Sequence, residues 1–199
     1  MFVQVIQGKV RDPEAASRHL ERWRDECCPG ASGLLGATGG VTDDGRMILV
    51  ARWRSQGDAG VTSARPVESA WWQELDRLLD GPLTFHDCND VALVAGGGDD
   101  DAGFVQIIQA RDRSGDPLPK VAGTLEPLLA RHRPDVMGAV LARAEDGTVT
   151  ETVYFTSEQA AREHEAEEPP EPDATTLRQL WGVPATELEF HDLHTPLLI

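Results

Sequence analysis

The sequence "FVQVIQ" occupies Phe2–Gln7, and "FVQIIQ" occupies Phe104–Gln109, 102 positions later. Both runs are short and rich in β-branched and aromatic residues, which is typical of a strand. Further matches follow in the same order: Asp12-Pro13 with Asp116-Pro117, Gly36-Ala37 with Gly138-Ala139, "DDG" at Asp43 with "EDG" at Glu145, and "FHD" at Phe85 with "FHD" at Phe190. This ordered recurrence predicts a tandem duplication.

The duplication divides the 199 residues into a first repeat, 1–95, a linker, 96–103, and a second repeat, 104–199. Glycine and aspartate dominate the linker, which predicts a flexible and solvated connection. A half of this size buries only a small core by itself. We therefore expect the two halves to form an intramolecular pseudo-dimer, so that the protein is a monomer or a weak homodimer.

The first repeat predicts the element order β-α-β-β-α-β, the ferredoxin-like split βαβ unit. Asp12 is placed to cap a helix that begins with Pro13 and carries apolar residues at helical spacing. The expected elements after the first strand are this helix, the strands Leu34–Thr38 and Arg46–Trp53 around the "DDG" turn, a second helix from about Pro66 to Leu79, and a strand over Leu83–Asp87 or slightly beyond.

The second repeat predicts the same order with two irregularities. Its first helix, from about Pro117 to His132, contains Pro127, which predicts a kink or a break. An acidic run, Glu163–Asp173, interrupts the second helical region and predicts a solvated loop or the edge of a lid. A short helical segment is then expected near Thr175–Trp181.

Composition restricts the partners and the compartment. A net charge of −16 argues against nucleic acid and against an anionic membrane surface, because both require a basic protein surface. No apolar run approaches the ~20 residues that span a bilayer, and no secretory signal is visible. Three cysteines in such a chain indicate reduced thiols and a cytoplasmic protein, and their spacing is not that of a zinc site. A small-molecule ligand or substrate remains the expected partner.

A local motif follows the third strand of each repeat. In the second repeat Phe155 is followed by Ser157 and then, nine residues after the aromatic, by His164; in the first repeat Trp53 and Ser55 match, but Thr62 replaces the histidine. With the element order, this motif resembles the antibiotic biosynthesis monooxygenase (ABM-like) branch of the dimeric α/β-barrel superfamily. The resemblance implies an α+β fold in which two tandem ferredoxin-like repeats form a pseudo-dimeric α/β barrel.

The resemblance also implies an activity. Some ABM-like proteins are cofactor-independent oxygenases of aromatic, polyketide-like substrates, in which a base removes a proton from a carbon acid and the carbanion reacts with O₂. Others degrade haem, using Asn, Trp and an axial His. Because neither repeat carries the strand-end Trp together with the His, we predict an oxygenase with no cofactor and no metal.

The residues for such chemistry are a base, an oxyanion-binding group and apolar walls. His86 is the candidate base, because histidine titrates near neutrality, and Asn89 could hold the oxyanion. Trp53, Trp72 and His164 are the candidate substrate-binding residues. The pocket is expected in the first half.

Each candidate also has a structural interpretation. The tryptophans could pack in the core, with Trp71 the more buried of the adjacent pair Trp71 and Trp72. His86 has a counterpart in His191, so that both could serve packing alone. Gln4 and Gln106 lie within apolar strands and could pair across the pseudo-two-fold axis or contact a ligand. His19 and His132 are expected to be exposed. A non-catalytic ligand-binding or scaffold protein is therefore the alternative to the oxygenase.

Overall fold

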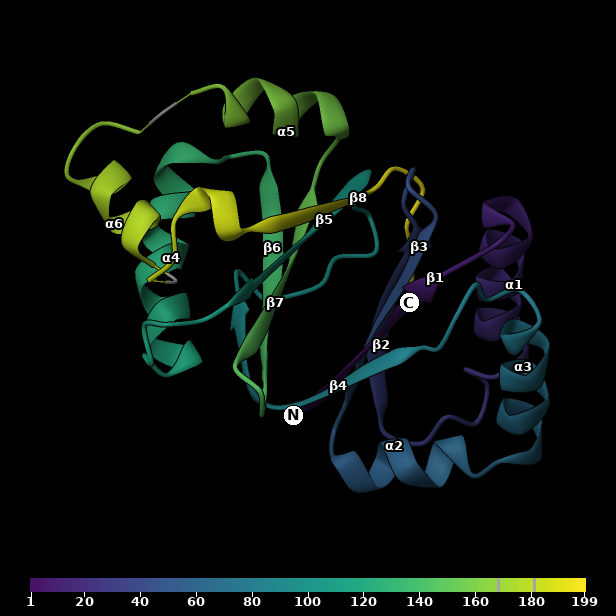
Figure 1. Cartoon of the computed structure of the whole chain (residues 1–199). Helices are drawn as coiled ribbons and strands as arrows, with labels where there is room; N and C mark the ends of the chain where they lie inside the picture. The colour runs from purple at the N-terminus through teal and green to yellow at the C-terminus, as the bar shows by residue number, and fades with distance from the viewer. Residues whose placement is uncertain (168, 181) are drawn as a thin grey trace. The chain divides into compact units, whose positions relative to one another are not determined.

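The computed structural model describes residues 1–167, 169–180 and 182–199. The chain forms two compact units (Figure 1): unit 1 comprises Met1–Asp87 and Thr195–Ile199, and unit 2 comprises Cys88–His194. None of the helices in the described residues is long and apolar enough to cross a membrane.

Unit 1 is an antiparallel sheet with helices packed on it. Its elements are β1 (Phe2–Lys9), α1 (Pro13–Glu26), β2 (Leu34–Val41), β3 (Arg46–Trp53), α2 (Gln56–Ser63), α3 (Pro66–Asp76), the first residues of β4 (Thr84–Val94), and β9 (Leu197–Leu198). The strand order is β4-β1-β3-β2-β9, and β3 is antiparallel to both of its neighbours. The helices α1 and α3 lie side by side (Figure 1).

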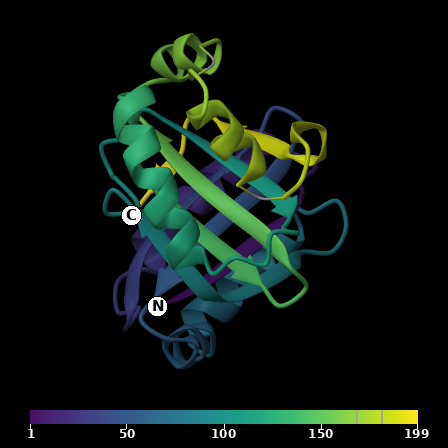
Figure 2. The same ribbon diagram turned by 90° about the vertical axis from the view of Figure 1, so that its left-hand side faces the viewer.

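Unit 2 repeats this architecture. Its elements are the remainder of β4, β5 (Phe104–Arg111), α4 (Leu118–His132), β6 (Val136–Ala144), β7 (Thr148–Phe155), α5 (Glu158–Glu165), α6 (Asp173–Gln179), the 3₁₀ turn Ala185–Glu187, and β8 (Glu189–Leu193). The strand order is β8-β5-β7-β6-β4, and α4 crosses the strands (Figure 2). The α+β fold class with two tandem ferredoxin-like repeats is confirmed.

The strand registers repeat as well. In unit 1, Phe2 of β1 lies opposite Trp53 of β3; in unit 2, Phe104 of β5 lies opposite Phe155 of β7. The partners in each pair are related by the same spacing of 102 positions that relates the two "FVQ" strands. The two units therefore place equivalent residues at the ends of equivalent strands, which allows their sites to be compared position by position.

The last strand of each repeat contributes to the other unit. Residues Cys88–Val94 of β4 pair with β6 in unit 2, and Leu197–Leu198 pair with β2 in unit 1. The compact units therefore differ from the sequence repeats 1–95 and 104–199, whose boundaries stay a prediction. Each of these strands extends the sheet that it joins, because it forms hydrogen bonds with backbone groups that an edge strand would leave unpaired.

The capping and packing of α1 agree with the sequence pattern. Asp12 accepts a hydrogen bond from the backbone N–H of Ala15 at 3.0 Å, and Pro13 begins the helix. The buried face of α1 includes Leu20 and Trp23 and packs into the core of unit 1 with Trp71 of α3. Trp71 is 1% exposed and Trp72 is half-buried, as the helical spacing predicted.

Several elements differ from the sequence prediction. Helix α2 was not predicted, because its two glycines interrupt the apolar spacing that indicates a helix. A hydrogen bond from the N–H of Asp58 to the Ser55 hydroxyl caps this helix. Helix α4 is not broken, and runs through Pro127. The predicted segment near Thr175–Trp181 is α6, except that residue 181 lies outside the described residues.

The prediction that His19 is exposed was wrong. Its side chain is buried and its ring stacks on Trp71 with a centroid distance of 4.5 Å. His19 Nε2 is 3.0 Å from the Trp71 carbonyl oxygen, and Trp71 Nε1 donates to the His19 carbonyl at the same distance. These two reciprocal hydrogen bonds join α1 to α3. The arginines that neighbour His19 in the sequence suggested an exposed side chain, and they give no information about a contact with another helix.

Candidate functional site

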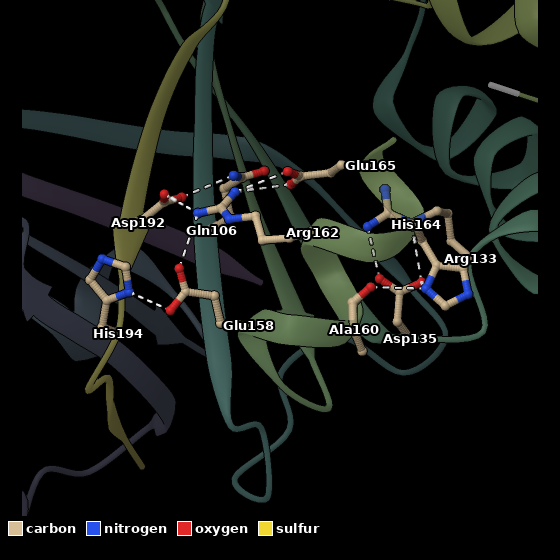
Figure 3. A network of polar contacts seen from close by, with 10 residues as sticks. All are labelled: Gln106, Arg133, Asp135, Glu158, Ala160, Arg162, His164, Glu165, Asp192 and His194. Atoms are coloured by element: carbon tan, nitrogen blue, oxygen red, sulfur yellow. Dashed lines mark hydrogen bonds and ion pairs between the residues drawn. The ribbon is translucent and has the colours of Figure 1, made fainter. Parts of the chain in front are cut away.

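A network of polar side chains lies in unit 2, where α5 meets the ends of the strands (Figure 3). Phe155 ends β7, and after Thr156 the chain turns into α5 at Ser157, whose hydroxyl accepts the N–H of Ala160 at 3.2 Å. Serine is a favoured N-cap because its oxygen satisfies a backbone donor that the first turn leaves free. The cap fixes where α5 begins and therefore where His164 lies.

His164 is held by two groups. Its Nδ1 lies 2.9 Å from the carbonyl oxygen of Ala160 and 3.6 Å from the carboxylate of Asp135. A carbonyl oxygen can only accept, so Nδ1 carries the proton in this arrangement and Nε2 of the neutral ring keeps a lone pair. In Figure 3 the other side of the ring points away from Asp135. This tautomer is the one that a histidine needs to accept a proton at Nε2.

Asp135 is a buried charge with a dedicated partner. Its side chain has no exposed surface, and Arg133 donates to both of its oxygens, from Nε at 3.1 Å and from Nη2 at 2.8 Å. A bidentate arginine–carboxylate pair is among the strongest side-chain interactions, and it offsets the cost of burying the carboxylate. The Arg133 guanidinium also lies over the Phe155 ring, 5.4 Å from its centroid.

An aromatic pair separates this part of the network from a second one. Phe104 and Phe155 lie with ring centroids 5.7 Å apart. The Arg162 guanidinium lies 5.1 Å from the Phe104 centroid and the His194 ring lies 5.9 Å from it. Cationic and aromatic side chains in this geometry attract each other through the ring quadrupole.

Arg162 joins α5 to β8. It forms an ion pair with Asp192, which also accepts a hydrogen bond from Gln106 at 2.9 Å. Burial opposes the charge on Arg162, but hydrogen bonds to Glu165 and Asp192 more than offset this and raise its pKa. Beside this pair, His194 Nδ1 lies 2.7 Å from the Glu158 carboxylate.

Only His164 among the sequence-predicted site residues belongs to this network. His86 is half-buried on β4 in unit 1, and Asn89 is exposed at a bulge of the same strand. In an extended strand three residues span roughly 10 Å, so the two are not brought together by their spacing. Their proposed roles, as base and oxyanion-binding group, stay predictions.

The two predicted tryptophan walls differ in burial. Trp53 is buried in the core of unit 1, and its indole Nε1 has no hydrogen-bond acceptor among the described residues. Trp72 packs at the edge of that core, with its ring 4.7 Å from Trp71 and 6.2 Å from the exposed Phe85. Substrate contact by either ring stays a prediction.

Sequence reasoning missed Asp135, Arg133 and Arg162. Nothing in the local pattern relates Asp135 to His164, 29 positions later, because their proximity depends on β6 beginning beside α5. Gln4 donates to Asp87 at 2.8 Å within unit 1 and Gln106 donates to Asp192 within unit 2, and the pairing of Gln4 with Gln106 across the pseudo-two-fold axis stays a prediction. The repeated "FHD" motif could have suggested these two contacts, because Asp87 and Asp192 are its aspartates in the first and second repeats.

Unit 1 lacks the equivalent network. The positions that correspond to His164, Arg162 and Asp135 hold Thr62, Gly60 and Gly33. Within the described residues no group of three or more His, Cys, Asp or Glu side chains is placed to hold a metal ion. The charged arrangement around α5 is therefore a feature of the second repeat only.

Comparison with known structures identifies the fold. Two solved structures named "putative monooxygenase" align with a TM-score of 0.71 for the protein from Lactobacillus acidophilus NCFM and 0.73 for that from Fusobacterium nucleatum subsp. nucleatum ATCC 25586. The first is 11% identical and covers 100% of this chain and 98% of its own; the second is 10% identical and covers 96% and 90%. This chain shares the fold of these two structures.

A third solved structure, of an anthrone oxidase-like protein, has a TM-score of 0.66 and 12% identity, and the alignment covers 99% of this chain and 92% of that chain. No family model matches the sequence, and no curated protein matches it. Sequence identities this low show that the folds are similar, and they do not show a shared activity. The shared fold therefore places the network around α5 on a known scaffold, and any activity depends on the residues of that network.

Proposed function

We propose that the protein is a small-molecule oxygenase that acts on an aromatic, polyketide-like carbon acid without a bound cofactor. The observation that carries this proposal is the setting of His164. Its Nδ1 is committed to the Ala160 carbonyl, its Nε2 is left to accept a proton, and a buried carboxylate stands 3.6 Å from Nδ1. This is the arrangement of a general base with an orienting group behind it.

In the proposed reaction, Nε2 of His164 removes a proton from an activated C–H group. The resulting imidazolium is stabilised by Asp135, whose carboxylate lies on the Nδ1 side. The carbanion supplies the electrons that reduce O₂ and a carbon–oxygen bond forms. The His164 imidazolium then returns its proton to the peroxide anion, which gives a hydroperoxide and restores the base. Loss of water from the hydroperoxide then yields a ketone. Each turnover converts a CH₂ group and one O₂ into a C=O group and one water.

The aromatic residues beside this base favour an aromatic substrate. Phe104 and Phe155 have rings 5.7 Å apart and are buried in the core of unit 2, so a polycyclic substrate would pack on them only after α5 moves aside. The likeness to an anthrone oxidase-like protein agrees with this class of substrate, although it rests on the fold. Anthrone, whose CH₂ group lies between two aryl rings, is a suitable test compound.

The sequence pattern favoured the first half for the pocket, whereas the geometry supports the second. With Thr62 and Gly33 at the positions of the base and its carboxylate, we propose that unit 1 has a scaffold role. The non-catalytic alternative extends this role to the whole chain.

The experiment that tests the proposal is oxygen uptake with anthrone in air-saturated buffer, with the spontaneous rate subtracted. We expect one O₂ consumed for each anthraquinone formed, and no effect of a chelator. Binding of anthraquinone without any protein-dependent uptake would support the non-catalytic alternative.

A further inference from the structure

Helix α5 is joined to the rest of unit 2 mainly by charged side chains. It has eight residues, of which only Ala161 is buried. Isolated helices shorter than about 12 residues are marginal in water, so α5 depends on tertiary contacts. One buried methyl group supplies little of the required stabilisation. The remaining contacts are the serine cap and the polar side chains described above.

Two side-chain pairs connect α5 to β8 and to the residue that follows it. They are Arg162 with Asp192, and Glu158 with His194 at 2.7 Å (Figure 3). We call these two pairs the latch. Their side chains are between 30% and 43% exposed, so water and salt reach both pairs. Exposed pairs of this kind are weak and are screened by salt.

When the latch opens, Arg162 and Asp192 each keep another polar partner. Arg162 keeps Glu165 as a partner within α5, with an ion pair of 3.0 Å. Asp192 keeps the hydrogen bond from Gln106 on β5 at 2.9 Å. Breaking an ion pair is costly mainly when one charge is left buried and unpaired, and neither partner here meets that condition. The closed position of α5 is therefore favoured by a small margin.

The position of α5 matters for the proposed base. His164 lies at the end of α5, whereas its carboxylate partner, Asp135, lies before β6. Arg162 and His194 lie against the Phe104 ring. Movement of α5 away from β8 would withdraw Arg162 from this ring and separate His164 from Asp135.

We propose that α5 is a gate, held closed by the latch, that admits substrate when it opens and assembles His164 with Asp135 when it closes. Asp192 is then a positioning residue that acts on His164 through Arg162. The role of the gate in catalysis rests on the proposed function, but its opening is a property of the free protein.

Unit 1 contains an internal reference for this gate. Helix α2 also has eight residues and is also capped by a serine, Ser55, but it has Gly60 at the position of Arg162. Its link to β4 is a hydrogen bond from the uncharged Gln56 amide to the Asp87 carboxylate at 3.4 Å, where α5 has ion pairing through Arg162. An effect of salt that depends on the latch should appear in α5 and not in α2.

The test is amide hydrogen exchange of the free protein, compared in 50 mM and 1 M KCl. We expect the Asp192→Asn variant to raise the exchange rates of α5 roughly two- to fivefold in low salt, the factor for one exposed ion pair. In the wild type, 1 M KCl should raise the α5 exchange rates by a similar factor, and in this variant the effect of salt should be smaller. Arg162→Gln should reproduce the effect from the other side of the pair.

The matched control is Glu163→Gln, which removes a charge of the same helix that pairs with Gln159 and not with β8. Its α5 exchange, and that of α2 in every sample, should stay at wild-type values. Unchanged α5 exchange in Asp192→Asn and Arg162→Gln would overturn the gate, as would an equal acceleration of α4, which would indicate general loss of stability. Because no substrate is present, a salt-sensitive α5 in a protein without oxygenase activity would leave the gate standing and reject only the proposed function.

Discussion

Asp135 and His164 form a pair in which one member is fully buried and the other reaches the surface. The Asp135 side chain has no exposed area, the His164 side chain is 27% exposed, and 3.6 Å separates the carboxylate from Nδ1. Arg133 neutralises the carboxylate from the other side. The carboxylate therefore stands beside His164 without being an uncompensated charge in the protein interior.

Replacement of Asp135 by Asn should destabilise the protein, because it leaves Arg133 without its bidentate partner. We expect a loss of about 2 kcal/mol in the free energy of unfolding, measured by urea denaturation. Asp25→Asn is the control: its pair with Arg24 is exposed, and the change should stay within about 0.5 kcal/mol. Equal effects of the two substitutions would show that Asp135 is not a buried structural charge.

The equivalent glycines Gly36 and Gly138 mark β-bulges in the two units. A Cβ at Gly138 would lie 2.2 Å from the carbonyl oxygen of Gly97, which is backbone and cannot easily move. Gly138→Ala should therefore cost about 1–3 kcal/mol of stability. Gly123→Ala in α4, where a Cβ meets nothing within 4 Å, should instead stabilise by about 0.5–1 kcal/mol. Thermal denaturation of both variants should show opposite signs.

Burial lowers the pKa of His19 below its ordinary value of 6.5, and the nearby Arg22 charge acts in the same direction. As the pH falls below about 6.5, the unfolded chain binds a proton at this position while the folded protein does not. Folding stability therefore decreases from this pH downwards until the lowered pKa is reached. The free energy of unfolding of His19→Gln should fall less between pH 7.5 and 5.5 than that of the wild type. Parallel pH dependences would contradict the burial of a neutral His19.

The adjacent thiols of unit 1 should be unreactive in the folded protein. Burial raises the pKa of Cys27 to about 12 and that of Cys28 to about 11, and the Glu68 carboxylate adds to both shifts. Because only the thiolate is alkylated, iodoacetamide at pH 8 should modify these residues at least about 100-fold more slowly than after unfolding in urea. Peptide mass mapping would measure both rates, and rapid native modification of Cys28 would refute the raised pKa.

The sequence predicted the architecture well because the fold depends on local and repeated signals. The Asp12 cap and the apolar stripe of α1, and the burial of Trp71 in α3, follow from the spacing of residues within each helix. The candidate site depends on long-range contacts. Asp135 reaches His164, and Arg162 reaches Asp192, only because β6 and β8 lie beside α5, and no periodicity reports that.

The same reasoning explains why the sequence pattern and the geometry favour different residues as the base. His86 was favoured as a base from its residue type and its place in a repeated motif, and the repeat itself gave it a structural interpretation. The motif that begins at Phe155 identifies His164 as a candidate, but the sequence does not indicate that Asp135 lies beside it. A buried carboxylate with a bidentate arginine is a tertiary feature that a single sequence does not reveal.

The central claim is that His164 is the base of an oxygenase, and the most direct measurement is the rate of anthrone-dependent oxygen uptake by His164→Gln beside His86→Gln. Loss of a general base slows turnover by about 10²–10⁴-fold. We predict such a loss for His164→Gln, with its fold intact by circular dichroism, and near-wild-type turnover for His86→Gln. A His164→Gln variant as active as the wild type, or a loss confined to His86→Gln, would contradict the account.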